Sequence, residues 1–123
     1  MSKTHKDLDI WQRGIDLVEH IYQATKGFPK DEEYGLKSQM RRAAVSYPSN
    51  IAEEAARSSK NEYVHFAYIA LGSLSELETQ LVIAGRLRYL EPTALLEEVE
   101  TLRRKTLNFI KYMKSGKSEG KSK

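Results

Sequence analysis

Apolar side chains recur every three or four positions in four separate stretches of this chain, and this spacing is the strongest constraint on its fold. The third stretch keeps the alternation of four and three from Tyr63 to Ala84 without a break. Such spacing places an apolar stripe along one side of a helix and is the seam pattern of left-handed helix packing. The sequence therefore predicts an all-α fold, with helices near residues 7–26, 31–58, 60–89 and 92–114.

The connections between these helices are short, which favours an antiparallel, up-down-up-down four-helix bundle. Pro29 follows the first helix, and Pro92 suits the first turn of the fourth, where a missing N–H is harmless. Pro48 lies inside the second helix and should kink it, because it removes a backbone hydrogen bond. We expect one helix there, since the apolar stripe continues from Met40 to Ala55, and two shorter helices are the alternative.

The start of the third helix is apolar on all sides. From Tyr63 to Leu71, eight of nine residues are apolar and only His65 is polar. Such a helix must be buried on more than one side, which favours a subunit interface in a homo-oligomer. A central, unusually enclosed helix is the alternative. The expected interface residues are Tyr63, Val64, Phe66, Tyr68 and Ile69.

Residue types that carry catalysis or hold cofactors form no recognisable pattern here. The chain has no cysteine, and its three histidines lie far apart without metal-ligand spacing. Glu62 and His65 have the spacing of half a di-iron motif, but the second copy is missing. We expect no catalytic residue, metal or cofactor, and therefore a protein that is not an enzyme. No stretch approaches the roughly 20 apolar residues of a membrane span, so we expect a cytoplasmic protein.

A group of polar residues lies on the second and third helices. We interpret it as a structural network between these helices, in which Arg42 and Glu76 belong together, and a ligand site is the alternative. A glycine inside a helix costs about 1 kcal/mol relative to alanine, so Gly72 indicates close packing. The network residues are Arg41, Arg42, Ser46, Asn50, Glu53, Gly72, Ser73 and Glu76.

The formal charge of +3 lies entirely at the carboxyl end of the chain. The last ten residues carry four lysines and one glutamate, and the preceding residues are neutral overall. We expect residues 1–114 to form the bundle and residues 115–123 to be a disordered, lysine-rich tail. An antiparallel bundle gathers the basic residues at one end, which suggests an RNA-binding module, and a protein scaffold or adaptor is the alternative. Possible nucleic-acid contacts are Lys3, Lys6, Arg57, Lys60, Lys111, Lys114, Lys117, Lys121 and Lys123.

Several of these segments resemble one family. The stretches LDIWQ at residues 8–12, FPK at 28–30, QMRRAAVSYPSNIAE at 39–53 and ALGSLSELE at 70–78 are similar to the four-helix bundle family of 23S rRNA intervening-sequence proteins. The resemblance implies a pentameric ring in the bacterial cytosol. Some family members are encoded inside insertions in ribosomal RNA genes, and a related bundle is the accessory protein of diversity-generating retroelements, which works with RNA and a reverse transcriptase. The family usually has a glycine where this chain has Glu54, which makes the second helix more regular.

Overall fold

The computed structural model describes residue 6, residues 8–56 and residues 60–115, and for residues 60–63 it describes the backbone alone. In these ranges the chain is helical and contains no strand, which confirms the prediction of an all-α fold with four long helices. The sequence predicts a disordered tail at residues 115–123. Ser115 is instead ordered as the cap of the last helix, with its N–H 3.0 Å from the Lys111 carbonyl, and residues 116–123 lie outside the described residues. The elements are α1 (Asp9–Thr25), the short 3-10 helix η2 (Lys30–Glu32), α2 (Leu36–Ala55), α3 (Lys60–Arg86) and α4 (Thr93–Lys114).

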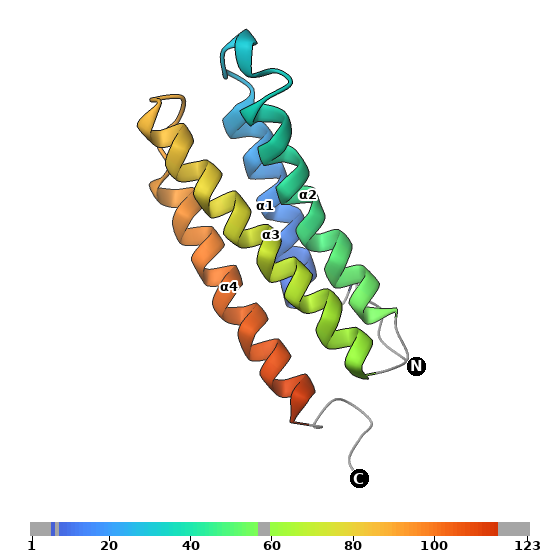
Figure 1. The fold of residues 1–123 in the computed structure, drawn as a ribbon. Coiled ribbons are helices and arrows are strands. Elements are labelled where there is room, and N and C mark those ends of the chain that lie inside the picture. Colours follow the sequence, from blue (N-terminus) through green and yellow to red (C-terminus); the bar gives the residue numbers. More distant parts are fainter. Residues whose placement is uncertain (1–5, 7, 57–59, 116–123) are drawn as a thin grey trace.

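α2, α3 and α4 bury most of the apolar stripe that their spacing predicted. In α1 the predicted face, with Trp11, Ile15 and Val18, is only half-buried. Ile10, Leu17 and Ile21 fill the core instead. The helices follow one another around the core, so that α1 lies between α2 and α4, and α3 lies between the same two on the other side. Figure 1 shows the start of α1, the end of α2, the start of α3 and the end of α4 together at one end, which we call the tail end. The opposite end, with η2 and the α3–α4 connection, is the loop end. The largest fully buried apolar side chains are Leu17, Ile21, Met40, Tyr47, Ile51, Leu74, Leu77, Leu81 and Leu102.

Pro48 lies within one continuous α2, so the two-helix alternative is wrong. It is buried beside a close contact of α1 and α2 at Gly14. A Cβ atom on Gly14 would lie 2.7 Å from Cδ2 of Tyr47 and 3.4 Å from Cβ of Pro48. The Tyr47 hydroxyl is 2.7 Å from Oγ1 of Thr106, so it also joins α2 to α4. Glycine at position 14 therefore lets a buried tyrosine reach across the core.

The second helix begins at Leu36, five residues later than expected. Asp31, Glu32 and Glu33 precede it and do not form its first turn. The Glu32 carboxylate explains this boundary, because its Oε1 accepts the Leu36 N–H at 3.0 Å. Its Oε2 accepts the Tyr89 hydroxyl at 2.9 Å. One side chain thus caps α2 and joins it to the α3–α4 connection.

The third helix ends at Arg86, before the expected residue 89. Arg88 has a φ of 65°, in the left-handed region that glycine usually occupies after a helix. The Tyr89 N–H bonds the Ala84 carbonyl at 2.9 Å and the Arg88 N–H bonds the Gly85 carbonyl at 3.0 Å. This pair of hydrogen bonds is a Schellman motif, so the end of α3 is a defined cap with an arginine in the glycine position.

Candidate nucleic-acid interface

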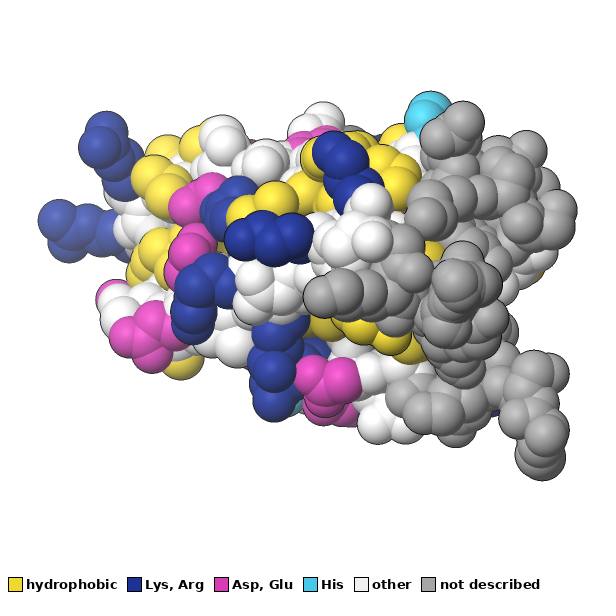
Figure 2. Space-filling view, turned by 90° about the horizontal axis from the view of Figure 1, so that it is seen from below, with side chains coloured by type: hydrophobic (Ala, Val, Ile, Leu, Met, Phe, Trp, Pro, Cys, Tyr) yellow, Lys and Arg dark blue, Asp and Glu magenta, His cyan; other side chains and the backbone are white. Residues whose placement is uncertain are grey.

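The basic residues expected at the tail end are only partly described. Lys6 is exposed, and Lys111 and Lys114 are exposed in the last turns of α4. Figure 2, which views the molecule from the tail end, shows Lys and Arg side chains beside exposed apolar ones, with some acidic side chains among them. The other candidates lie outside the described residues or, for Lys60, have an undescribed side chain: Lys3, Arg57, Lys60, Lys117, Lys121 and Lys123.

A groove of about 610 Å³ lies along the outer side of α4 near the tail end. It contains Lys111 and Lys114, the two described candidate lysines, and adds Arg104, which was not predicted from the sequence. Spacings of seven and ten residues place Lys111 and Lys114 on the same helical face as Arg104, and this spacing could have identified it. All residues that line the groove are described, and none of them is acidic: Tyr68, Arg104, Leu107, Asn108, Ile110, Lys111 and Lys114.

Tyr68 forms the α3 side of this groove. Its side chain is 47% exposed, and Nζ of Lys114 lies 3.5 Å from its hydroxyl and 5.8 Å from its ring centroid. The neighbouring Arg103 is used differently, because it binds both Glu78 and Glu100, and these hydrogen bonds raise the pKa of Arg103. The groove therefore has a cationic wall beside an aromatic ring, with the carboxylates bound to a different arginine.

The expected network between α2 and α3 forms through three of its residues. The Ser46 and Ser73 hydroxyls lie 2.7 Å apart across the two helices. Nδ2 of Asn50 donates to the Ser46 carbonyl at 2.9 Å and to the Ser46 hydroxyl at 3.1 Å. These contacts satisfy polar groups on partly buried helix faces.

Other members of the network point elsewhere. Arg42 and Glu76 are both exposed, and no hydrogen bond or ion pair joins them in the described part of the chain. Glu76 instead accepts a hydrogen bond from Gln80 at 3.3 Å. Glu53 is exposed, and a Cβ atom on Gly72 would meet no atom within 4 Å. The pairing of Arg42 with Glu76 and the close packing at Gly72 are therefore wrong, because both positions face solvent.

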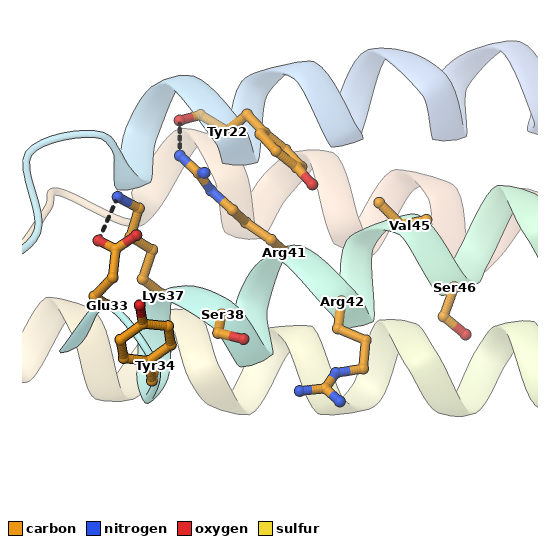
Figure 3. Close-up of a pocket in the computed structure, with 9 residues that line it drawn as sticks. All are labelled: Tyr22, Glu33, Tyr34, Lys37, Ser38, Arg41, Arg42, Val45 and Ser46. Atoms are coloured by element: carbon orange, nitrogen blue, oxygen red, sulfur yellow. Dashed lines mark hydrogen bonds and ion pairs between the residues drawn. The ribbon is translucent and has the colours of Figure 1, made fainter.

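Arg41 belongs to the α1–α2 contact. Its Nε donates to Oγ1 of Thr25 at 2.9 Å, and its Nη2 donates to the Tyr22 carbonyl at 3.1 Å. The guanidinium carbon lies 4.2 Å from the centroid of the Tyr22 ring. A second groove, of about 590 Å³, begins here and extends over the outward face of α2 (Figure 3). Its lining residues are Tyr22, Glu33, Tyr34, Lys37, Ser38, Arg41, Arg42, Val45 and Ser46.

The expected interface residues at the start of α3 are not all outward. Val64 and Phe66 are half-buried, whereas Tyr68 and Ile69 are exposed, and the Tyr63 side chain is outside the described residues. Exposed apolar side chains also lie near the other end of α3, at Val82, Ile83 and Leu87. The exposed apolar surface of α3 is therefore not confined to its first turns.

One buried carboxyl was not anticipated. Glu54 is 2% exposed, and its Oε1 has no hydrogen-bond partner in the described part of the chain. Burial raises the pKa of Glu54 to about 7. The sequence held a signal for this, because Met40, Tyr47 and Glu54 are seven residues apart and the first two are core positions. Ala55, which we placed on the stripe, is exposed.

The described residues contain neither a cluster of metal ligands nor a membrane-spanning helix. Among the described residues no three His, Asp or Glu side chains lie close enough together to hold a metal ion. His20 instead contacts Glu98 on α4, with Nδ1 at 2.9 Å from both carboxylate oxygens. No helix in the described ranges combines the length and the apolar character needed to span a membrane.

This chain is similar to one known protein family and, in its fold, to a solved structure. The pattern that defines the 23S rRNA-intervening sequence protein family matches residues 6–113. A solved structure with the same fold is a protein of unknown function from the S23 ribosomal protein family of Bacteroides thetaiotaomicron. It is 18% identical, has a TM-score of 0.75, and the match covers 83% of this chain and 98% of that chain. No curated protein matches the sequence.

Proposed function

This chain belongs to the family of 23S rRNA-intervening sequence proteins, and from that premise we propose that it binds RNA as a non-enzymatic accessory protein. One observation carries the proposal. The α4 groove holds Arg104, Lys111 and Lys114, and no acidic residue lines it. The residues before the last ten have no net charge, yet this groove is lined by cations and an aromatic ring and by no carboxylate.

The chemistry of this groove suits a single strand. Cations attract phosphates without reading the sequence, and an aromatic ring offers a stacking surface to any base. Tyr68 and Leu107 are both about half exposed beside the cations. We propose that the groove contacts phosphates and the faces of bases, and that it therefore binds RNA with little sequence preference.

Self-association forms part of the proposal. We propose that antiparallel bundles assemble into a cytoplasmic ring, with the exposed apolar side chains of α3 at the contact. Clusters of exposed apolar side chains commonly mark contact sites, and several copies of one groove would raise avidity. Light scattering should give a mass well above the 14.1 kDa of one chain. A monodisperse monomer at micromolar concentration would exclude the ring.

The RNA experiment compares two triple variants by fluorescence polarisation with a labelled single-stranded RNA. Replacing Arg104, Lys111 and Lys114 with glutamine should flatten the plot of log affinity against log salt by about 2, at about 0.7 per phosphate contact. The control makes the same change to glutamine at Lys26, Lys30 and Arg86, three exposed cations at the loop end, and should leave the salt slope nearly unchanged. Equal effects of the two variants would show a non-local charge effect and contradict the proposed groove.

The lysine tail is tested separately. Ending the chain after Lys114 should preserve folding and assembly, and it should flatten the salt slope further, because three lysines leave with the tail. The same affinity and slope without the tail would restrict RNA binding to the bundle.

A protein scaffold is the second candidate, favoured by the exposed apolar residues of α3. Its binding would depend weakly on salt, because docking of apolar surface releases few counterions. Two results together would support the scaffold. The wild type would bind no RNA, and an Ile69→Ser, Ile83→Ser double variant would lose the binding of a protein partner.

A further inference from the structure

The outward face of α2 carries more positive charge than its neighbours neutralise. Lys37 is paired with Glu33 at 3.1 Å, and Glu33 is the one acidic residue among those that line this described groove. Arg41 and Arg42 add two more cations. Arg42 is exposed and forms no hydrogen bond or ion pair within the described ranges. An anion could therefore approach Arg42 without displacing a carboxylate.

Arg41 is already fixed in position at the edge of the same groove. Its hydrogen bonds to Thr25 and to the Tyr22 carbonyl use Nε and Nη2, so these contacts leave Nη1 unused. The guanidinium carbon also lies over the Tyr22 ring, 4.2 Å from its centroid, and this cation–π contact helps to hold the side chain. A cation that is immobilised before binding loses less conformational freedom when an anion arrives.

Tyr34 is the second unusual feature of this face. Its side chain is 94% exposed, the most exposed large apolar side chain among the described residues. Figure 3 shows Tyr34, Ser38 and Arg42 on the same side of α2, with the serine between the aromatic ring and the guanidinium. The fold gains almost no burial from this ring, so its removal should leave the bundle intact.

We propose that this face binds one base and its phosphate from single-stranded nucleic acid, with the base stacked on Tyr34 and the phosphate held by Arg42. The inference rests on the proposed RNA binding and adds a second contact, distinct from the α4 groove. An acidic peptide would satisfy the cations but would not need a flat, fully exposed ring. The ring beside a guanidinium therefore favours a nucleotide.

Stacking and phosphate binding respond differently to salt, and this separates the two roles. Tyr34→Ala should weaken binding of an adenine-rich single-stranded RNA about fivefold or more, with an unchanged salt slope. Tyr34→Phe keeps the ring and should bind like the wild type. Arg42→Gln should flatten the slope by about 0.7, whereas Arg86→Gln, the same change outside this groove, should not.

The outcomes separate this site from the proposed function as a whole. A wild-type protein that binds no RNA overturns both. Salt-dependent RNA binding with full affinity in Tyr34→Ala overturns only the α2 site and leaves the α4 groove in place. Two further results also overturn the site: competition by a polyglutamate peptide with equal affinity for wild type and Tyr34→Ala, or a lower oligomer mass in Tyr34→Ala. The first would assign the face to acidic proteins and the second to a subunit contact.

Discussion

The buried carboxyl of Glu54 should make this bundle less stable as the pH rises through neutrality. In the folded protein burial raises its pKa from 4.5 to about 7, and no described group offers Oε1 a hydrogen bond. The folded state therefore binds a proton more tightly than the unfolded state does. The stabilisation from this proton is fully present below about pH 4.5 and is lost as the pH rises through about 7.

The size of the effect follows from the two pKa values. A separation of one pH unit corresponds to about 1.4 kcal/mol, so the interval from 4.5 to about 7 corresponds to about 3 kcal/mol. Glu54→Gln removes the titration and retains the shape of the side chain. The free energy of unfolding of this variant, relative to wild type, should therefore rise by about 2–3 kcal/mol between about pH 5 and pH 8.

Urea unfolding at several pH values measures this difference directly, and thermal melting should show a change of about 10 °C between the two proteins. Comparison with wild type cancels the titration of the other groups. Glu97→Gln, at an exposed position of α4, is the matched control and should follow the wild-type curve. A Glu54→Gln curve parallel to wild type across this range would refute the reasoning, since it would mean that the buried carboxyl does not titrate near neutral pH.

Substitutions at four further positions test the packing by urea unfolding. Gly14→Ala should destabilise the fold by about 1–3 kcal/mol, because the new methyl group meets the buried Tyr47 ring, whereas Gly72→Ala should stabilise it by up to about 1 kcal/mol. The opposite order would contradict the close approach of α1 and α2. Arg88→Gly should stabilise the protein by about 0.5–1 kcal/mol by relieving the left-handed backbone, and Arg88→Ala, which keeps a Cβ, should not. Glu76→Ala should change the free energy of unfolding by less than about 0.5 kcal/mol, because the side chain is exposed. A loss of several kcal/mol would instead support the pairing of Glu76 with Arg42.

The sequence predicted the helices well because burial of an apolar stripe is a local property. Leu74, Leu77 and Leu81 recur at helical spacing and all are fully buried. The start of α2 could not be predicted in the same way. It depends on the Glu32 carboxylate, which also bonds a tyrosine 57 positions away.

The polar residues were harder to place because one residue along a helix is a rotation of about 100°. Arg41 therefore turns toward α1 while Arg42 points outward, although the two are adjacent. Gly14 and Gly72 illustrate the same limit. Both lie inside helices, but only Gly14 has a ring against it, and nothing in the local sequence tells them apart. Ser46 and Ser73 were both placed in the network, although not as a pair, and their hydroxyls meet across α2 and α3.

The Glu32 contacts also bear on how the two proposed surfaces would respond to a ligand. At the loop end, one carboxylate bonds a helix start and a tyrosine on another connection, so the spacing of the chain segments there is fixed. Links nearer the tail end include Asp9 with Lys105 and Tyr68 with Lys114, contacts between exposed side chains that contribute little stability. Because the α2 face adjoins the loop end, we expect its shape to change little when a ligand binds. In the α4 groove we expect adjustment through rotation of the exposed Tyr68 and Lys114 side chains.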